Sequence, residues 1–333
     1  MASGVRAPRL IPVTLADIPP ELTGGVVAVG NFDGVHEGHR VLLAAARAEA
    51  DRRGAPAVVL TFEPHPRTYF RPTEPVFRLT SLAAKARLLG ALGMDGLVVA
   101  DFDRSLAAMD AETFVADILV GGLKLKAAVV GFNFHFGKGR GGSPALLAAK
   151  GAAKGFAVDI VGEVAGAHTG QRLSSSVIRQ HLAEGDIAAA NADLGYRWFA
   201  IATVIPGDRR GRDLGFPTAN LRLEPDCRLR HGVYAVRLQR ADGTIHDGVA
   251  SYGRRPTFDN GAPILEVFVL DFAGDLYGER VAVSFLDWLR PELRFDSMDE
   301  LVTAMNGDVA AARAVLRRMG PGSAIDEKLA GRF

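Results

Sequence analysis

Two histidines stand close together in a glycine-containing segment near the start of the chain, and their spacing suits phosphate chemistry. The segment is Gly30-Asn31-Phe32-Asp33-Gly34-Val35-His36-Glu37-Gly38-His39. His36 and His39 are three residues apart, so on a first helical turn both imidazoles project to one side. There they can donate hydrogen bonds to a phosphate whose negative charge grows in the transition state. Gly34 and Gly38 let the backbone approach that phosphate, and the helix N-terminus adds partial positive charge.

The histidine pair also has plainer interpretations. Both side chains can be packing residues of a tight turn, although flanking glycines at a strand-to-helix junction favour a ligand site. Zinc binding is disfavoured, because no Asp, Glu or Cys accompanies the pair in metal-ligand spacing.

A second polar cluster stands at the start of another predicted helix and consists of Ser174, Ser175, Ser176 and Arg179. Hydroxyls and unpaired backbone N–H groups, with an arginine one turn later, can hold the terminal phosphates of a nucleotide. A plain N-cap with a solvated arginine explains the same residues equally well.

A basic loop in the second half of the chain combines glycines, arginines and oxygen-bearing side chains. It covers residues 207–220, and its glycines and arginines suit a triphosphate by offering flexible backbone donors and positive charge. Thr218 and Asn220 alternate on an extended segment behind Pro217, and their oxygens suit Mg²⁺. The alternative is a basic surface loop followed by a strand. The candidate nucleotide-binding residues here are Gly207, Arg209, Gly211, Arg212, Gly215, Thr218 and Asn220.

Glu266 is a carboxylate in an otherwise apolar strand pattern. Period two puts it on one face with Ile264, Phe268 and Leu270, where a charge needs a reason. One reason is a general base that takes a proton from a substrate hydroxyl. The alternative is a strand-end salt bridge to an arginine.

A rival motif, G-x-G-x-x-G, occurs at residues 137–142 between a predicted strand and a helix, with Asp159 at a distance suitable for a ribose contact. A dinucleotide dehydrogenase is therefore a competing hypothesis. It is disfavoured because the motif follows the fourth strand rather than the first, carries Lys138 and Arg140, and leaves the histidine pair unexplained.

The elements that would position these residues change type near Gly195. Before it, short apolar runs alternate with helical patterns, which predicts a parallel sheet covered on both faces. The expected strands are Val26–Phe32, Ala57–Phe62, Leu97–Phe102, Ala127–Phe134 and Phe156–Val161. The expected helices cover about residues 38–53, 81–92, 111–119, 175–183 and 187–194, and one more begins after Ser143; Thr80, Asp110 and Ser143 are the predicted N-caps of the second, third and last of these.

After Gly195 the strands lack helices of normal length between them, which predicts an antiparallel barrel or sandwich. These strands are Phe199–Ile205, Gly232–Leu238, Gly248–Ser251, Ile264–Phe272 and Arg280–Phe285. Ala241–Thr244 is a hairpin turn signal, and apolar residues at helical spacing predict a closing helix over Met298–Arg318. The two domains are expected at residues 1–195 and 196–333.

Composition excludes several classes of protein. The 333 residues are 48% hydrophobic and 23% charged, as in a globular chain. Since 39 basic and 38 acidic side chains nearly cancel, no general field for polyanions exists and nucleic acid is not an expected partner. One cysteine excludes an internal disulfide framework. No apolar run approaches the ~20 residues of a membrane span, and no secretory signal is visible, so we expect a soluble, cytoplasmic protein.

Several of these segments together resemble one enzyme family. Residues 30–39 are similar to the HxGH signature of nucleotidyltransferases, in the form G-x-F-D-G-x-H-x-G-H of bacterial bifunctional riboflavin kinase/FAD synthetases. Residues 211–220, G-R-x-L-G-F-P-T-A-N, resemble the riboflavin kinase signature of the same family. Further agreeing segments are Thr61–Pro66, Leu79-Thr80 with Lys85, Gly131–Arg140, Leu173–Arg179, His231–Tyr234, Gly253–Phe258, Asp271–Gly278 and Arg290–Glu292.

The resemblance implies an α/β Rossmann-like nucleotidyltransferase domain followed by an antiparallel, riboflavin kinase-like β-barrel with a C-terminal helix. It implies ATP-dependent phosphorylation of riboflavin to FMN, then adenylylation of FMN to FAD with release of pyrophosphate. Mg²⁺ would enter with ATP, and the partners would be the small molecules ATP, riboflavin and FMN. No nucleic acid or membrane partner is expected, and the oligomeric state stays open.

The resemblance also assigns roles to residues. His36 and His39 would be catalytic in adenylylation, and Glu266 would be the base in phosphorylation. Thr218 and Asn220 would hold the metal. The other nucleotide-binding residues would be Gly30, Phe32, Asp33, Gly34, Gly38, Ser174, Ser175, Ser176, Arg179, Gly207, Arg209, Gly211, Arg212 and Gly215, and the flavin-binding residues would be His65, Asn133, Arg290 and Glu292.

The match has departures, and other functions stay open at this point. Ser176 replaces the usual threonine, Asn133 stands where aspartate is more common, and residues 195–198 depart from the usual Gly-Arg-Pro-aromatic. One alternative is a nucleotidyltransferase that acts on another phosphate or alcohol and whose barrel only binds a ligand. Such a protein would not phosphorylate riboflavin. A flavin-binding sensor or riboflavin store would bind flavin without consuming ATP, whereas a dehydrogenase would use a nicotinamide cofactor.

Overall fold

The computed structural model of the chain describes residues 10–164, 173–207, 215–254, 262–331 and 333. These residues form two compact units. The first comprises the chain up to Val76 together with Lys85–Ser174, and the second comprises Phe77–Ala84 together with Ser175–Phe333. The two packing units therefore change over after Ser174. The boundary predicted after Gly195 separates the two catalytic halves of the chain, and it stays a prediction.

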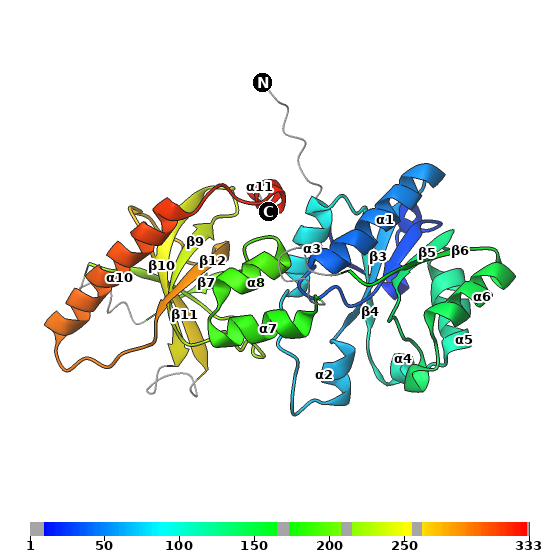
Figure 1. Cartoon of the computed structure of the whole chain (residues 1–333), viewed down its shortest axis with the longest axis horizontal. Helices are drawn as coiled ribbons and strands as arrows, with labels where there is room; N and C mark the ends of the chain where they lie inside the picture. Colours follow the sequence, from blue (N-terminus) through cyan, green and yellow to red (C-terminus); the bar gives the residue numbers. More distant parts are fainter. Residues whose placement is uncertain (1–9, 165–172, 208–214, 255–261, 332) are drawn as a thin grey trace, which may run out of the picture. The chain divides into compact units, whose positions relative to one another are not determined.

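Six parallel strands form the sheet of the first unit (Figure 1). In spatial order they are β1 (Val13–Thr14), β4 (Gly96–Asp101), β3 (Ala57–Glu63), β2 (Val26–Val29), β5 (Ala127–Gly131) and β6 (Ala157–Val161). Every neighbouring pair is parallel, which confirms the predicted α/β class. The chain builds outward from β2 through β3 to β4 and then returns to β5 on the other side of β2. Ligands bind at such a reversal, beyond the carboxyl ends of the strands.

Helices connect these strands. They are α1 (Glu37–Arg53), α2 (Pro66–Phe70), α3 (Leu82–Ala91), α4 (Arg104–Ala108), α5 (Ala111–Thr113) and α6 (Pro144–Lys154), with the short 3-10 turns η1 (Leu15–Asp17), η2 (Pro20–Leu22) and η4 (Lys138–Arg140). After three residues α5 continues as a π-helix, η3 (Phe114–Gly122), which the sequence pattern did not predict.

The predicted N-caps are correct in two of three cases. The Asp110 carboxylate accepts a hydrogen bond from the Thr113 N–H at 2.7 Å, and the Ser143 hydroxyl accepts one from the Leu146 N–H at 3.2 Å. The prediction of Thr80 was wrong, because α3 begins at Leu82 and Ser81 Oγ accepts from the Ala84 N–H at 3.3 Å. Two adjacent hydroxyl residues are equally good caps, and only the backbone course separates them.

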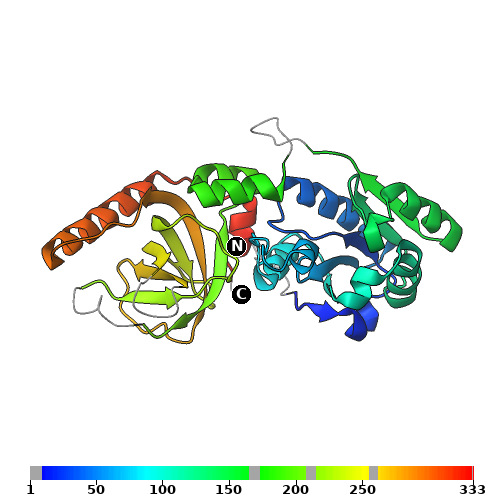
Figure 2. The same cartoon turned by 90° about the horizontal axis from the view of Figure 1, so that it is seen from below.

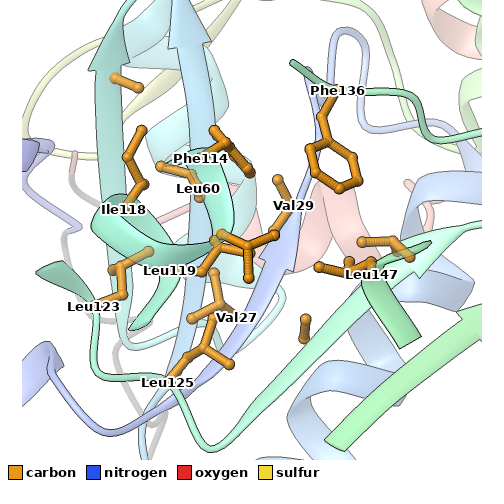
Figure 3. Close-up of a cluster of buried hydrophobic side chains, with 14 of the residues drawn as sticks. Val27, Val29, Leu60, Phe114, Ile118, Leu119, Leu123, Leu125, Phe136 and Leu147 are labelled. Atoms are coloured by element: carbon orange, nitrogen blue, oxygen red, sulfur yellow. The ribbon is translucent and has the colours of Figure 1, made fainter. Parts of the chain in front are cut away.

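One hydrophobic core of the first unit lies between the sheet and the η3 and α6 helices (Figure 3). Val27, Val29 and Leu60 from β2 and β3 meet Leu119 of η3 and Leu147 of α6 there, and each of the five is at most 2% exposed. Truncating such a residue to alanine costs roughly 2–5 kcal/mol. This packing fixes β2, whose carboxyl end leads into the histidine segment.

The second unit is a closed antiparallel barrel, as the change of pattern after Gly195 predicts. Around the barrel its strands are β10 (Ile245–Arg254), β11 (Pro263–Val269), β8 (Thr218–Leu221), β7 (Phe199–Ile205), β12 (Arg280–Arg290) and β9 (Gly232–Gln239). The turn between β9 and β10 is the predicted one: Gly243 has φ +96° and the Arg240 N–H donates to the Thr244 carbonyl at 2.8 Å.

Helix α10 (Met298–Arg318) has the predicted bounds and packs on β9, β10 and β12 (Figure 2). Its buried residues Ala312, Val315 and Leu316 form one cluster with Val233 and Val249 of the barrel wall. Helices α7 (Ser175–Glu184) and α8 (Ile187–Leu194) precede the barrel, and a short α11 (Ala324–Leu329) follows α10. No helix in the described part of the chain is both long and apolar enough to cross a membrane.

Candidate active sites

The histidine segment lies between β2 and α1, at the reversal of strand order. His36 is the N-cap residue of α1, and its ring stacks on that of His39 with centroids 3.8 Å apart and planes at 19°. The Phe32 ring meets His39 edge-on, with centroids 5.4 Å apart. The two imidazoles therefore lie together, as their spacing predicts.

The backbone before His36 is unusual. Phe32 and Val35 have φ values of +47° and +40°, and Gly34 between them has +83°. The left-handed region costs a non-glycine residue roughly 1–2 kcal/mol and is rare for a β-branched side chain such as valine. Such conformations persist where the surroundings enforce them, and they concentrate at functional sites. Here both side chains are anchored in the core, at 1% exposure for Phe32 and 0% for Val35.

His39 is held in its neutral form. Burial lowers its pKa well below 6.5, and the neighbouring charges of His36, Lys85 and Arg40 lower the pKa further. Its buried Nδ1 has no hydrogen-bond partner among the described residues. A neutral imidazole has one N–H donor and one acceptor nitrogen, so His39 keeps hydrogen-bonding capacity for a bound group.

A cavity of about 890 Å³ opens beside this segment. The Gly30 end of β2 and the loop after β5 both line it, together with Asn133 from that loop and His65 from the start of α2. His65 Nδ1 accepts a hydrogen bond from the Arg67 N–H at 3.1 Å and so caps α2. The predicted flavin-binding residues His65 and Asn133 thus share one cavity with Gly30.

Seven phenylalanine and tyrosine side chains and four cationic side chains line the cavity. An aromatic wall suits a planar ring system, and cations suit a phosphate. Part of this wall lies in two segments that carry the family resemblance, Thr61–Pro66 and Gly131–Arg140. The other wall residues come from separate segments without a motif, so the sequence does not indicate them. The aromatic lining residues are Phe62, Tyr69, Phe70, Phe102, Phe114, Phe134 and Phe136, and the cationic ones are Arg67, Arg104, Lys138 and Arg140.

The rival motif at residues 137–142 forms part of this cavity wall and not a dinucleotide turn. Gly142 pairs back with Phe136 through two backbone hydrogen bonds of 2.8 and 3.2 Å, which closes the segment on itself. A dinucleotide-binding turn instead leads straight from a strand into a helix N-terminus. The geometry therefore gives no support to the dehydrogenase hypothesis.

The predicted serine cluster stands at a helix start, as expected, because α7 begins at Ser175. Arg179 Nε donates a hydrogen bond to the Phe77 carbonyl at 2.6 Å within the second unit. Nucleotide binding by Ser174, Ser175, Ser176 and Arg179 stays a prediction.

In the barrel, strand register brings the predicted phosphate-transfer residues together. Glu266 of β11 lies opposite Asn220 of β8, and Phe268 lies opposite Thr218. Side chains of directly paired residues share a face, as do residues two apart along a strand. Glu266, Asn220 and Thr218 therefore project from one face of two adjacent strands, although the sequence separates them widely.

Asn220 is suited to hold a cation. It is 5% exposed, and its Oδ1 is buried without a hydrogen-bond partner among the described residues. Gly207 lies so close that a Cβ there would overlap the Asn220 carboxamide. The orphaned oxygen and the Thr218 hydroxyl fit the oxygen preference of Mg²⁺. Of the other predicted residues of the basic loop, Gly215 has a positive φ of +83°. Arg209, Gly211 and Arg212 lie outside the described residues.

Glu292 is a second carboxylate on the Glu266 side of the barrel. Burial raises its pKa, and the charge of nearby Glu266 raises it further, while His231, at 3.8 Å from Nδ1 to Oε2, lowers it. Gly253 leaves the space that the Glu292 carboxylate occupies, since a Cβ at Gly253 would overlap it. The requirement for glycine at 253 has no sequence signal, because Glu292 is distant in the chain.

Arg290 makes a bidentate ion pair with Asp308 of α10. Its Nε and Nη2 each lie 2.6 Å from an Asp308 oxygen, and Nη1 donates to the Pro291 carbonyl at 2.9 Å. The Asp308 residue is 8% exposed. The guanidinium predicted to bind flavin is thus engaged in holding α10 to the barrel, and direct flavin binding by Arg290 stays a prediction.

Each half of the chain is similar to a known enzyme family. A family model described as FAD synthetase matches residues 18–177, and one described as riboflavin kinase matches residues 194–316. The bifunctional riboflavin kinase/FMN adenylyltransferase of Escherichia coli (strain K12) is 40% identical over 299 residues, which cover 90% of this chain and 94% of that protein. The Pseudomonas fluorescens enzyme of the same description is 42% identical over 302 residues, 90% of this chain and 96% of its own.

A solved structure has a similar fold over most of the chain. The crystal structure described as a macrolide-efflux protein from Streptococcus pneumoniae aligns with a TM-score of 0.78 and 32% identity. The alignment covers 92% of this chain and 99% of that one. Efflux is part of the description of that protein only.

Proposed function

Since the chain belongs to the bifunctional riboflavin kinase/FMN adenylyltransferase family, it is an enzyme that converts riboflavin to FMN and FMN to FAD, and we propose which residues carry each reaction. Residues 1–195 carry the adenylylation and residues 196–333 carry the phosphorylation. This division is supported by the two separate groups of chemically suited side chains described above.

In the proposed adenylylation, a phosphate oxygen of FMN attacks the α-phosphorus of ATP and pyrophosphate leaves. No side-chain nucleophile is needed, because the substrate phosphate supplies the attacking atom. His36 and His39 stabilise the charge that grows on the reacting phosphates. The stacking of the two rings and the neutral state of His39 support this role, because both residues then act as positioned hydrogen-bonding groups.

The cavity at the Gly30-Asn31 end of the histidine segment would take the flavin. Its aromatic wall contacts the isoalloxazine, with His65 and Asn133 as polar contacts, and the cations at the wall attract the FMN phosphate. Gly30, Phe32, Asp33, Gly34 and Gly38 form the proposed nucleotide side of the same site.

In the proposed phosphorylation, Glu266 takes the proton of the riboflavin 5′-hydroxyl as that oxygen attacks the γ-phosphorus of ATP, and ADP leaves. Thr218 and Asn220 would hold the Mg²⁺ that enters with ATP, which neutralises charge on the transferred phosphoryl group. Positioning and charge neutralisation supply most of the catalysis in such transfers. The observation that carries this half is the strand register that sets Glu266 directly opposite Asn220.

We propose that the basic loop at residues 207–220 and the serine cluster at residues 174–179 bind the nucleotide in these two reactions. We also propose a cytoplasmic location, which the need of both reactions for ATP supports.

Substitutions that separate the two reactions test this assignment. His36→Ala or His39→Ala should stop FAD formation from FMN and leave FMN formation from riboflavin intact. Glu266→Ala should do the reverse when FMN is supplied. Chromatography of products from riboflavin or FMN with magnesium and ATP measures both. Loss of both reactions in a folded single variant would refute the division.

A further inference from the structure

Lys85 is a buried cation that the proposed mechanism does not use. It lies on α3 and is 3% exposed. Its Nζ donates to the Thr61 hydroxyl at 3.1 Å and lies 3.4 Å from Glu63 Oε1. Taking an ammonium group out of water costs several kcal/mol as an order of magnitude unless it is well paired. A buried ammonium that is kept at this position therefore calls for a role, and its printed contacts show where it acts.

The hydrogen bonds of Lys85 lead directly to the histidine segment. Thr61 is fully buried, at 0% exposure, and its hydroxyl donates in turn to the Asn31 carbonyl at 3.1 Å. Hydrogen bonds from a charged donor are roughly twice as strong as neutral ones, and a chain of them is cooperative. Lys85, Thr61 and Asn31 thus form a relay that starts on α3, crosses the end of β3 and ends on the backbone after β2.

The relay ends next to a part of the backbone with an unfavourable conformation. Asn31 directly precedes Phe32, the first of the three residues with positive φ at positions 32, 34 and 35. Burial fixes the side chains of Phe32 and Val35, but burial is not directional and leaves the peptide plane of Asn31 to hydrogen bonding. That plane sets the direction in which the chain leaves β2 toward His36.

We propose that Lys85 and Thr61 are positioning residues for adenylyl transfer, which hold the Asn31–Val35 turn so that His36 and His39 face the reacting phosphates. The inference rests on the proposed assignment of FMN adenylylation to the histidine pair. Neither side chain needs to touch substrate, because both act through the Asn31 carbonyl.

Two variants of Thr61 test the relay without changing any charge. Thr61→Val keeps the side-chain shape and removes the hydroxyl, whereas Thr61→Ser keeps the hydroxyl. Displacement of catalytic groups by about 1 Å costs about 100-fold in rate, so Thr61→Val should lower kcat for FMN adenylylation by about 10- to 100-fold with less change in KM. Thr61→Ser should restore most of that loss. Lys85→Met should reproduce the Thr61→Val result.

The riboflavin kinase reaction of the same polypeptide is the internal control for folding. It should stay within about two-fold of wild type in all three variants, and the unfolding midpoint should be recorded for each. Unchanged adenylylation in Thr61→Val would overturn the relay. So would a parallel fall of both reactions, or failure of Thr61→Ser to recover activity, because either result indicates a merely structural role. If instead His36→Ala leaves adenylylation intact, the assignment of the reaction to this site fails, and the two failures are thereby distinguished.

Discussion

The His39 side chain is buried beside positively charged groups, and this environment determines how we expect the adenylylation rate to depend on pH. Its pKa lies well below 6.5 because of burial, and His36, Lys85 and Arg40 lower the pKa further. Since His39 stays neutral as the pH falls through 6.5, kcat for FMN adenylylation should hold there and decline only at more acidic pH. Steady-state measurements of kcat at pH values above and below 6.5 check this prediction. A fall of kcat with its midpoint near pH 6.5 would contradict it.

Lys85→Met sharpens the pH prediction. It removes one of the positive neighbours of His39, so the pKa of His39 rises and the acid limb moves to higher pH. Thr61→Val leaves the ammonium in place and should not move that limb. A pH profile of both variants therefore separates the charge of Lys85 from its hydrogen bond, and identical profiles would contradict this separation.

Single residues were predicted where the signal is local in the sequence. His36 and His39 follow from a three-residue spacing, and Glu266 follows from the alternation within one strand. Contacts across the fold were not predictable in that way. The pairing of Glu266 with Asn220 depends on strand register, and the space that Gly253 leaves for Glu292 depends on two distant segments.

At the scale of elements, the ion pair between Arg290 and Asp308 joins the end of β12 to α10. Its two 2.6 Å contacts hold Arg290, which lies two residues before Glu292, and Glu292 is close enough to Glu266 for the charge of Glu266 to raise its pKa. The pair therefore sets both the position of the helix and that of a proposed flavin contact.

Asp308→Ala tests this connection. Removing one partner of a buried ion pair costs roughly 3–5 kcal/mol, so the unfolding midpoint in urea should fall. The KM for riboflavin should rise, because the segment from Arg290 to Glu292 loses its contact with α10, while FMN adenylylation should be unchanged. Arg313→Ala, which removes the exposed ion pair of the same helix with Asp271, is the matched control and should affect neither property. Equal effects of the two substitutions would contradict a special role for Asp308.

The elements themselves were predictable where their pattern is long or their caps are distinct. The five longer parallel strands, five of the six barrel strands and α10 follow from hydrophobic period. The four-residue β8 was not among the predicted strands. The two-residue β1 is too short to show a period. The switch from α5 to the π-helix η3 lengthens each backbone hydrogen bond by one residue along the chain, which side-chain type does not reveal.

At the scale of the whole molecule, no single division point along the chain separates the two packing units. Phe77–Ala84 lies within the N-terminal half of the sequence but packs in the second unit, where the Trp198 indole N–H donates to the Leu79 carbonyl at 2.8 Å. Arg78 in the same segment pairs with Glu224 at 2.7 Å. A boundary placed from composition alone cannot find such an excursion, because the segment has no distinct composition.

We infer that the chain holds two complete and separate sites, one for each step from riboflavin to FAD. A mixture of His36→Ala and Glu266→Ala proteins tests this most directly, with riboflavin, magnesium and ATP as the only substrates and products followed by chromatography over time. We expect that neither variant alone yields FAD and that the mixture does, with FMN appearing first. FAD from either variant alone, or none from a mixture whose members each retain their own half-reaction, would contradict it.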